Sequence, residues 1–324
     1  MSSRSRGLEG RARQSQRGAA LLTAMIIVTL VATLAASMVW QQWRAVQVET
    51  AERARGQAAW LLTGAVDWAR LLLKEDARNG GADHLGEPWA TPLAEARLST
   101  FLAADKNSTE DAPDAFLSGG ITDAQARYNL TNLVAQGKVD PVELAAFGRL
   151  CETTGAPGEV ATRIANGLLS AQNAVGPAGV DVAAPLLPRS VSQLGWLGVD
   201  AETVRLLTPY VVLLPRATPV NVNTASREVL VAAIKGLDLA SAEHLIQVRQ
   251  RAHFKALGDV EHELPALAPL DTARLSISSS FFQVRGRLRL GDRVLEQTNL
   301  VERRGLEVVI LQRERVSSRD QPNS

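Results

Sequence analysis

The first 80 residues carry two hydrophobic patterns, one after the other. From residue 18 to residue 42 there is no charged side chain, and most positions are apolar. Beyond Arg44 charges return, and apolar residues recur at spacings of three and four: Trp60, Leu61, Gly64, Ala65, Trp68, Leu71 and Leu72. Such spacing gathers side chains on one side of a helix. The pattern predicts one long helix over 19–78, apolar all round at first and amphipathic afterwards, with a stop at Asn79-Gly80-Gly81.

The rest of the chain changes from helical to alternating patterns. Helices are predicted at 140–153, 157–173, 190–196, 200–208, 226–235 and 240–251. Asp140 precedes Pro141 and is expected to cap the first of them, while Thr224 or Asn223 is expected to cap the helix near 226–235. Alternation at 275–289, 293–303 and 306–316, with turns at Gly291-Asp292 and Arg304-Gly305, predicts an antiparallel meander. The order of elements indicates an α+β fold.

Composition narrows the classes of function. The 324 residues are 46% hydrophobic and 21% charged, with a net charge of +1, so the chain is not a disordered one. The one cysteine, Cys151, excludes an internal disulfide and a multi-cysteine metal site, and we expect it to be a buried helical residue. No HExxH, GxGxxG or GxSxG motif occurs, and we expect no enzyme activity.

Charge is concentrated at the N-terminus. Five arginines and one glutamate lie in residues 1–17, directly before the uncharged run. The run is long enough to span a bilayer, and basic residues before it place that end in the cytoplasm. Trp40 and Trp43 then lie where an interfacial aromatic belt is expected. The segment is a signal anchor, a secretory signal cut near Ala32, Ala35 and Ala36, or a signal cut before the apolar run.

The residues Gln16-Arg17-Gly18-Ala19-Ala20-Leu21-Leu22-Thr23 favour the last of these possibilities. They resemble the cleavage site of type IV prepilins and type II secretion pseudopilins, where a peptidase cuts after a glycine that follows a short basic leader. The resemblance implies that residues 1–18 are a leader, that prepilin peptidase cuts between Gly18 and Ala19, and that Ala19 is then N-methylated.

Thr23 departs from the usual pattern of that superfamily. It takes the fifth mature position, where most members carry a glutamate that pairs with the terminal amine of a neighbouring subunit. The type II secretion minor pseudopilin K family typically lacks this glutamate. Thr23 therefore resembles a subunit at the tip of the filament, although a threonine is also an ordinary residue in a membrane helix.

Two further segments resemble the same family. One is residues 120–133, which include Asp123, Arg127-Tyr128-Asn129-Leu130 and Leu133, and the other is Thr218–Ala225. The resemblance implies a pilin-like fold, in which a long N-terminal helix packs on an antiparallel sheet and an all-helical domain is inserted. The expected parts are a leader (1–18), a transmembrane or filament helix (19–43), a head (44–135 plus 269–316), the insertion (136–268) and a tail (317–324). The head is expected to cover the apolar stripe of the helix.

A second resemblance offers an alternative function. Residues 221–260 resemble a helix-hairpin-helix module, which would make the chain a membrane-anchored DNA-binding or uptake protein. The turn reads Gly236-Leu237-Asp238, with an aspartate where the second glycine of such modules lies. The flanks have no basic face, and removal of the leader leaves a slightly acidic chain. We expect no nucleic-acid partner.

One acidic stretch has the oxygen-rich character of calcium sites. Asp105, Asn107, Glu110, Asp111 and Asp114 are its candidate ligands, although their spacing is not that of an EF-hand. A solvated acidic loop explains the same residues. No other cofactor is indicated.

The family resemblance implies a function in protein export across the outer membrane. The expected role is to initiate and cap the pseudopilus. The expected partners are the minor pseudopilins of the I and J types, the pseudopilus, prepilin peptidase and the inner-membrane assembly platform. The expected location is the cell inner membrane, crossed once, with the head in the periplasm.

Overall fold

The computed structural model describes residues 8–97, 115–176, 179–180, 183–290 and 293–319. The chain divides into two compact units, one ending at Leu61 and the other beginning at Leu62. Helix α1 (Leu8–Asn79) begins in the first unit and ends in the second. It confirms the prediction of one long helix, and the backbone turns at Gly80, whose φ is +66°.

The second unit contains a five-stranded antiparallel sheet. Its strands lie in the order β1 (Leu93–Arg97), β2 (Ala115–Asp123), β11 (Phe281–Leu290), β12 (Arg293–Arg304) and β13 (Glu307–Arg319). β11, β12 and β13 form the predicted meander, and Gly305 turns between the last two with φ +59°. The predicted turn at Gly291-Asp292 lies outside the described residues.

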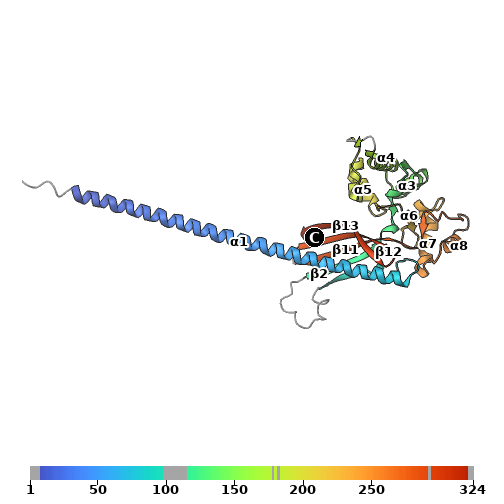
Figure 1. Ribbon diagram of the computed structural model, residues 1–324, viewed down its shortest axis with the longest axis horizontal. Coiled ribbons are helices and arrows are strands. Elements are labelled where there is room, and N and C mark those ends of the chain that lie inside the picture. Colours follow the sequence, from blue (N-terminus) through green and yellow to red (C-terminus); the bar gives the residue numbers. More distant parts are fainter. Residues whose placement is uncertain (1–7, 98–114, 177–178, 181–182, 291–292, 320–324) are drawn as a thin grey trace, which may run out of the picture. The chain divides into compact units, whose positions relative to one another are not determined.

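Strand β2 explains how the helical part of the chain is inserted. It pairs with β11 from Asp123 opposite Phe282 to Ala115 opposite Leu290, although more than 150 residues separate these partners. Everything between the two strands therefore leaves the sheet and returns to it. Figure 1 shows the helices α3 to α8 gathered beyond one end of the sheet. Their position confirms the α+β fold with a helical insertion.

The elements of this insertion are short. Its helices are α3 (Pro141–Thr154), α4 (Glu159–Asn173), α5 (Ala201–Leu207), α6 (Arg227–Ala233), α7 (Leu239–Arg251) and α8 (Leu257–Glu263). Single turns of 3-10 helix lie at Pro88–Ala90, Ala124–Ala126 and Leu130–Leu133, and a longer one at Val191–Leu197. Two-residue strands pair as β3 (Tyr128–Asn129) with β8 (Val211–Val212), β4 (Val134–Ala135) with β5 (Lys138–Val139), β6 (Val175–Gly176) with β7 (Gly179–Val180), and β9 (Val220–Asn221) with β10 (Leu275–Ser276).

Capping residues fix where these helices begin. Asp140 accepts hydrogen bonds from the N–H groups of Val142 and Glu143, as predicted from the Asp-Pro pair. The predicted cap of α6 was wrong, because Ser226 rather than Thr224 or Asn223 accepts from the N–H of Val229. The side chains of Thr224 and Asn223 are instead bonded to distant parts of the chain.

Helix α1 lies against the sheet in the second unit, on a side that differs from the predicted one. Its buried side chains are Leu62, Val66, Ala69 and Leu73. They pack with Trp89 and with strand residues that include Phe282, Val284, Val301 and Val308. Gly286 lets α1 approach closely, because a Cβ there would lie 3.0 Å from the Leu62 side chain. The predicted stripe is therefore out of phase, and Trp60, Trp68 and Leu71 are exposed.

Candidate functional site

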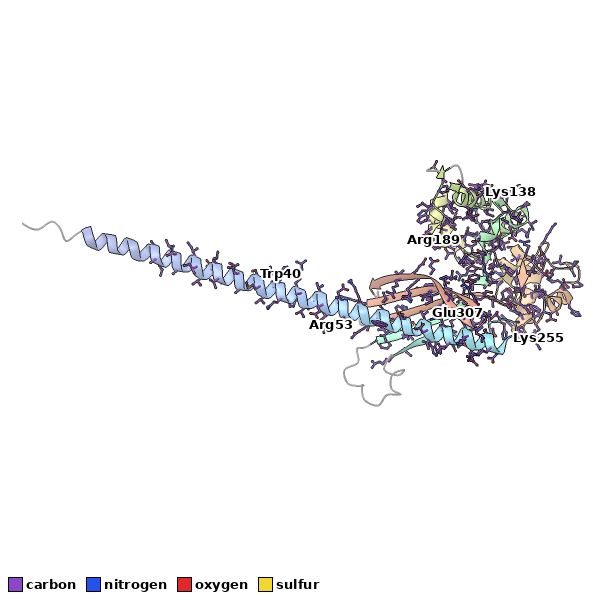
Figure 2. The ribbon with its side chains drawn as sticks, in the orientation of Figure 1. Trp40, Arg53, Lys138, Arg189, Lys255 and Glu307 are labelled. Carbon is purple, nitrogen blue, oxygen red and sulfur yellow. The ribbon has the colours of Figure 1, made fainter. Side chains whose placement is uncertain are left out.

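The first part of α1 is an apolar rod. Among the described residues, one helix is long and apolar enough to cross a membrane; the matching stretch runs from Ala19 to Asn79, with a mean hydropathy of 2.4 in its most apolar window. The large apolar side chains from Leu21 to Trp43 are all 53–67% exposed, and Trp40 is drawn in Figure 2. A helix that is apolar on every side needs lipid or other helices around it.

The predicted processing site lies in this helix. The backbone is helical on both sides of the Gly18–Ala19 bond. The Thr23 hydroxyl donates to the carbonyl oxygens of Ala19 and Ala20, at 2.9 and 3.0 Å. Thr23 therefore satisfies its polar group within its own helix and brings no charge to the apolar surface.

A second apolar surface lies further along α1. Trp68 and Leu71 are 55% and 62% exposed, and helical periodicity places them on one side of the helix together with Gly64. We call these three residues the outer stripe. An exposed tryptophan next to an exposed leucine forms an apolar surface, and aromatic residues are enriched where proteins meet.

The calcium candidates Asp105, Asn107, Glu110, Asp111 and Asp114 are not placed by the structure. All five lie within 98–114, outside the described residues. The structure instead gathers Asp76, Asp83 and Glu87, whose ligand atoms lie within 4.8 Å of one another. These residues carried no signal in the sequence, because a single carboxylate at the end of a helix and two in a loop form no motif.

Arg303 forms hydrogen bonds with two of these three carboxylates. It donates to both carboxylate oxygens of Asp83, at 2.6 and 2.7 Å, and also to Asp76. Burial raises the pKa of Asp83, and Arg303 opposes that rise. Burial also raises the pKa of Asp76, helped by Glu87 and again opposed by Arg303. The group is therefore an arginine–carboxylate cluster that ties α1 and its following loop to β12, and a cation there would compete with Arg303.

A buried polar joint connects the sheet to the insertion. Asp123 ends β2 and is fully buried; its Oδ2 accepts hydrogen bonds from Thr224 (2.6 Å), Ser279 (2.6 Å) and Asn221 (3.0 Å). Its Oδ1 accepts from the N–H of Gln125 at 2.7 Å. Burial raises the pKa of Asp123, and the hydroxyl donors oppose this. The two segments that carried the family resemblance, 120–133 and 218–225, therefore meet here.

Asn129 and Asn132 continue this connection. Asn129 accepts from the N–H groups of Thr131 and Leu214, and Asn132 both donates to and accepts from Thr218. These amides hold the turn after β3. The strands and the insertion are thus joined by side chains that satisfy each other's backbone groups.

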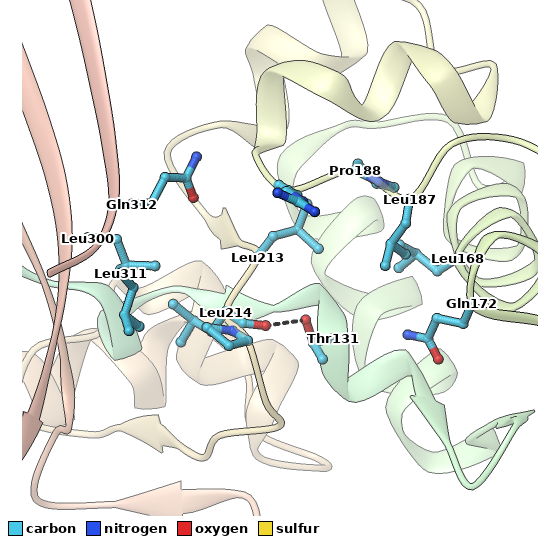
Figure 3. Close-up of a pocket in the computed structure, with 12 residues that line it drawn as sticks. Thr131, Leu168, Gln172, Leu187, Pro188, Leu213, Leu214, Leu300, Leu311 and Gln312 are labelled. Atoms are coloured by element: carbon cyan, nitrogen blue, oxygen red, sulfur yellow. Dashed lines mark hydrogen bonds between the residues drawn. The ribbon is translucent and has the colours of Figure 1, made fainter. Parts of the chain in front are cut away.

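A cleft of about 330 Å³ opens beside the joint, between the sheet and the insertion. Figure 3 shows Leu300 and Leu311 on the strand side, and Leu168, Leu187 and Pro188 on the helical side. Thr131 donates to the carbonyl oxygen of Leu214 at the floor of the cleft, at 2.7 Å. Its lining is mostly apolar, and Arg189 is the one charged side chain among the described residues that line it.

The helix-hairpin-helix resemblance fails at the start of α7. The Asp238 carboxylate accepts from the N–H of Ser241 at 2.7 Å, which occupies the helix end where a phosphate would bind. That hydrogen bond lowers the pKa of Asp238, so the carboxylate stays anionic and repels phosphate. Gly236 has φ +84° and makes the predicted turn. The turn geometry is present, but the phosphate site is closed.

Cys151 lies in the core of the insertion, as predicted. Its side chain is fully buried among apolar residues of α3 and its neighbours. Burial raises the pKa of the thiol to about 11. A thiol with that pKa is almost wholly protonated at neutral pH and is a poor nucleophile.

Comparisons with known proteins agree on one family. Two models described as type II secretion system protein K match residues 126–216 and 220–280. The type II secretion system protein K of Pseudomonas aeruginosa is 31% identical over 304 residues, which cover 87% of each chain. The protein K of Pectobacterium carotovorum is 28% identical, covering 93% of this chain and 97% of that protein.

A solved structure supports the fold. The crystal structure of the GspK-GspI-GspJ complex from the enterotoxigenic Escherichia coli type 2 secretion system contains a chain that matches with a TM-score of 0.61 and 21% identity. The match covers 83% of this chain and 99% of the other. Together with the identity to the Pseudomonas protein, these findings confirm the resemblance seen in the sequence. The chain belongs to the type II secretion system protein K family.

Proposed function

We propose that this chain is the minor pseudopilin that starts and caps the pseudopilus during protein export across the outer membrane. The observation that carries the proposal is the apolar, exposed start of α1, with Thr23 at the fifth position when Ala19 is counted as the first. An apolar rod leaves lipid readily only if similar helices replace the lipid around it. A rod without a carboxylate at Thr23 lacks the charge that would pair with the amine of a subunit above it.

The proposed partners are the minor pseudopilins of the I and J types. The related chain was solved in a complex with GspI and GspJ, which supports this assignment. The outer stripe of α1 offers an apolar surface for their helices, because Trp68 and Leu71 are 55% and 62% exposed whereas Val66 and Leu73 are buried against the sheet. We propose that this stripe, with the apolar rod, makes the contact.

Processing by prepilin peptidase precedes assembly in this proposal. The leader ends at Gly18, and Ala19 becomes the methylated first residue. The bond lies within a helical stretch, so the helix must open locally for the peptidase, and Gly18 lowers the cost of opening because glycine is a poor helix former. The arginines before it hold the N-terminus in the cytoplasm, and the head lies in the periplasm beside the inner-membrane assembly platform.

The proposed role is structural rather than catalytic. Cys151 is buried, and its thiol has a pKa of about 11, which removes the one thiol as a nucleophile. The DNA-binding alternative is not supported, because Asp238 closes the phosphate site and the family is one of secretion proteins. In this proposal the chain contributes binding surfaces to assembly and catalyses no reaction.

Replacement of Thr23 tests the position in the filament. In membranes that hold the whole secretion system, Thr23→Glu is expected to move the subunit from the tip into the shaft, so that cross-linking recovers it with the major pseudopilin. Thr23→Val removes the hydroxyl without adding charge and should stay with the minor pseudopilins. Recovery of Thr23→Glu with the same partners as the unchanged chain would contradict a tip role for Thr23.

A further inference from the structure

A pocket of about 370 Å³ lies where the loop after α1 meets the end of α7. It is lined by four basic or titratable side chains, His84, Arg249, Arg251 and His253, and by no carboxylate among the described residues. The two histidines come from segments almost 170 residues apart, yet their rings stack with centroids 3.8 Å apart and an angle of 9°. None of these residues belongs to α1, the joint or the cleft.

The arginines differ in how they are held. Arg249 donates to the carbonyl oxygens of Val222 and Ala225, so its guanidinium is fixed in place, while no carboxylate of the described residues contacts it. Arg251 is exposed, and among the described residues its side chain makes no hydrogen bond or ion pair. A fixed cation beside a free one is an arrangement that suits a bound anion.

The histidines add hydrogen-bond donors. The Nδ1 atom of His84 accepts from the N–H of Gly86 at 3.1 Å, so a neutral His84 carries its proton on Nε2 and can donate from there. His253 makes its ring contact with His84 and, within the described part of the chain, no hydrogen bond. The pocket thus offers several donors that the protein itself does not use.

We propose that this pocket binds a carboxylate of an acidic peptide segment from another protein. Charge complementarity carries the assignment, since the lining provides cations and donors without an acceptor of opposite charge. Leu85 lines the same pocket and is 59% exposed, which gives an apolar residue next to the carboxylate a surface to cover. A peptide is therefore favoured over a free inorganic anion, which has no use for Leu85.

Binding is expected to tighten as the pH falls. Burial lowers the pKa of His253, and the nearby His84 and Lys255 lower it further. The carboxylates closest to this region are committed elsewhere: Asp83 to Arg303, and Glu87 to Trp89 and the His84 N–H, while Glu243 acts on Arg249 from within α7. A bound carboxylate stabilises protonated His253, so binding takes up a proton and is stronger at pH 5.5 than at pH 7.5.

The test uses the full chain, purified in detergent, and an acetylated, amidated hexapeptide of alternating Asp and Leu. A peptide of alternating Asn and Leu and inorganic phosphate serve as comparison probes in the same calorimetric titration. We expect the acidic peptide to bind at least about tenfold more tightly than the neutral one. Arg251→Glu should weaken the acidic peptide about tenfold or more, and His253→Ala should flatten its pH dependence.

Arg205→Glu is the matched control, because Arg205 is also an exposed arginine and lies on α5, outside the pocket. It should bind the acidic peptide as the unchanged chain does. Equal loss in both arginine variants would reduce the effect to net charge and overturn the proposal. So would equal affinity for the acidic and neutral peptides, or binding of phosphate with no binding of the acidic peptide.

Discussion

The Oγ1 atom of Thr224 donates a hydrogen bond of 2.6 Å to the Oδ2 atom of Asp123, across 101 residues of sequence. Asp123 ends the strand that leaves the sheet, and Thr224 lies in the insertion just before α6. Ser279 and Asn221 donate to the same oxygen, which brings the start of the returning strand to this point as well. One carboxylate thus holds together three segments that meet where the insertion leaves the sheet.

Removal of this carboxylate should loosen the joint. Asp123→Ala removes the acceptor of four hydrogen bonds, those from the Thr224 and Ser279 hydroxyls, the Asn221 amide and the Gln125 N–H. We expect it to lower the free energy of unfolding by about 3 kcal/mol. Asp123→Asn keeps the size but replaces one acceptor with a donor, and should cost about 2 kcal/mol. Urea unfolding followed by circular dichroism measures both. Asp271→Asn, at an exposed aspartate, serves as the control, and a similar small change in all three would contradict the role of the joint.

Two leucines on α1 lie on different sides of the helix, one against the sheet and one in the outer stripe. Leu73 is fully buried against the sheet and Leu71 is 62% exposed. Leu73→Ala should therefore lower the free energy of unfolding by about 3 kcal/mol, whereas Leu71→Ala should change it by less than about 0.5 kcal/mol. The same unfolding experiment compares the two variants. Equal losses would contradict the placement of Leu73 on the covered side and of Leu71 on the outer stripe.

The outer stripe should matter for assembly rather than for folding. Trp68→Glu places a charge in the apolar surface proposed for the partner helices, and should reduce co-purification with the minor pseudopilins of the I and J types by about tenfold. Thermal unfolding of the variant should stay close to that of the unchanged chain, since Trp68 is exposed. Asn79→Asp adds the same charge at the exposed end of α1 and should co-purify normally. Undiminished recovery with Trp68→Glu would remove the stripe from the interface.

Because the thiol of Cys151 is buried, we expect the free energy of unfolding to fall at alkaline pH. Burial raises the pKa of its thiol from the ordinary value of 9.0 to about 11 in the folded chain. Above pH 9 the unfolded thiol ionises first, so the folded state loses stability as the pH rises towards 11. Cys151→Ala lacks this loss, and its free energy of unfolding should fall less than that of the unchanged chain over the same interval. Parallel curves for the two proteins would contradict the buried, protonated thiol.

Local patterns were enough to predict most of the fold. The uncharged run and the amphipathic segment after it indicated one helix, and the alternating C-terminal segments indicated a meander, because both periods are set by backbone geometry. The resemblance of residues 120–133 and 218–225 to one family also pointed to the segments that form the joint. Both kinds of signal depend on neighbouring residues or on a shared motif. The structure contains the predicted helix and meander, and it brings the two segments together.

Two features could not be predicted from the sequence: which side of α1 faces the sheet, and which residues far apart in the chain form pairs. Helix α1 has apolar residues on two sides, and only the approach of Gly286 and Phe282 decides that Leu62 and Val66 are covered instead of Trp60 and Trp68. Arg303 meets Asp83 across 220 residues, because the register of β12 and the turn after α1 bring them together. Neither residue lies in a motif, so no local pattern foretold their cluster.

The mass of the mature N-terminus shows where the chain is cut. We propose that prepilin peptidase frees an apolar helix that begins at Ala19 and is then able to stack with other pseudopilins. Peptide mass spectrometry of the protein from cells with an active secretion system should find N-methylated Ala19 as the first residue. An intact Met1, or a first residue near Ser37, would contradict the account.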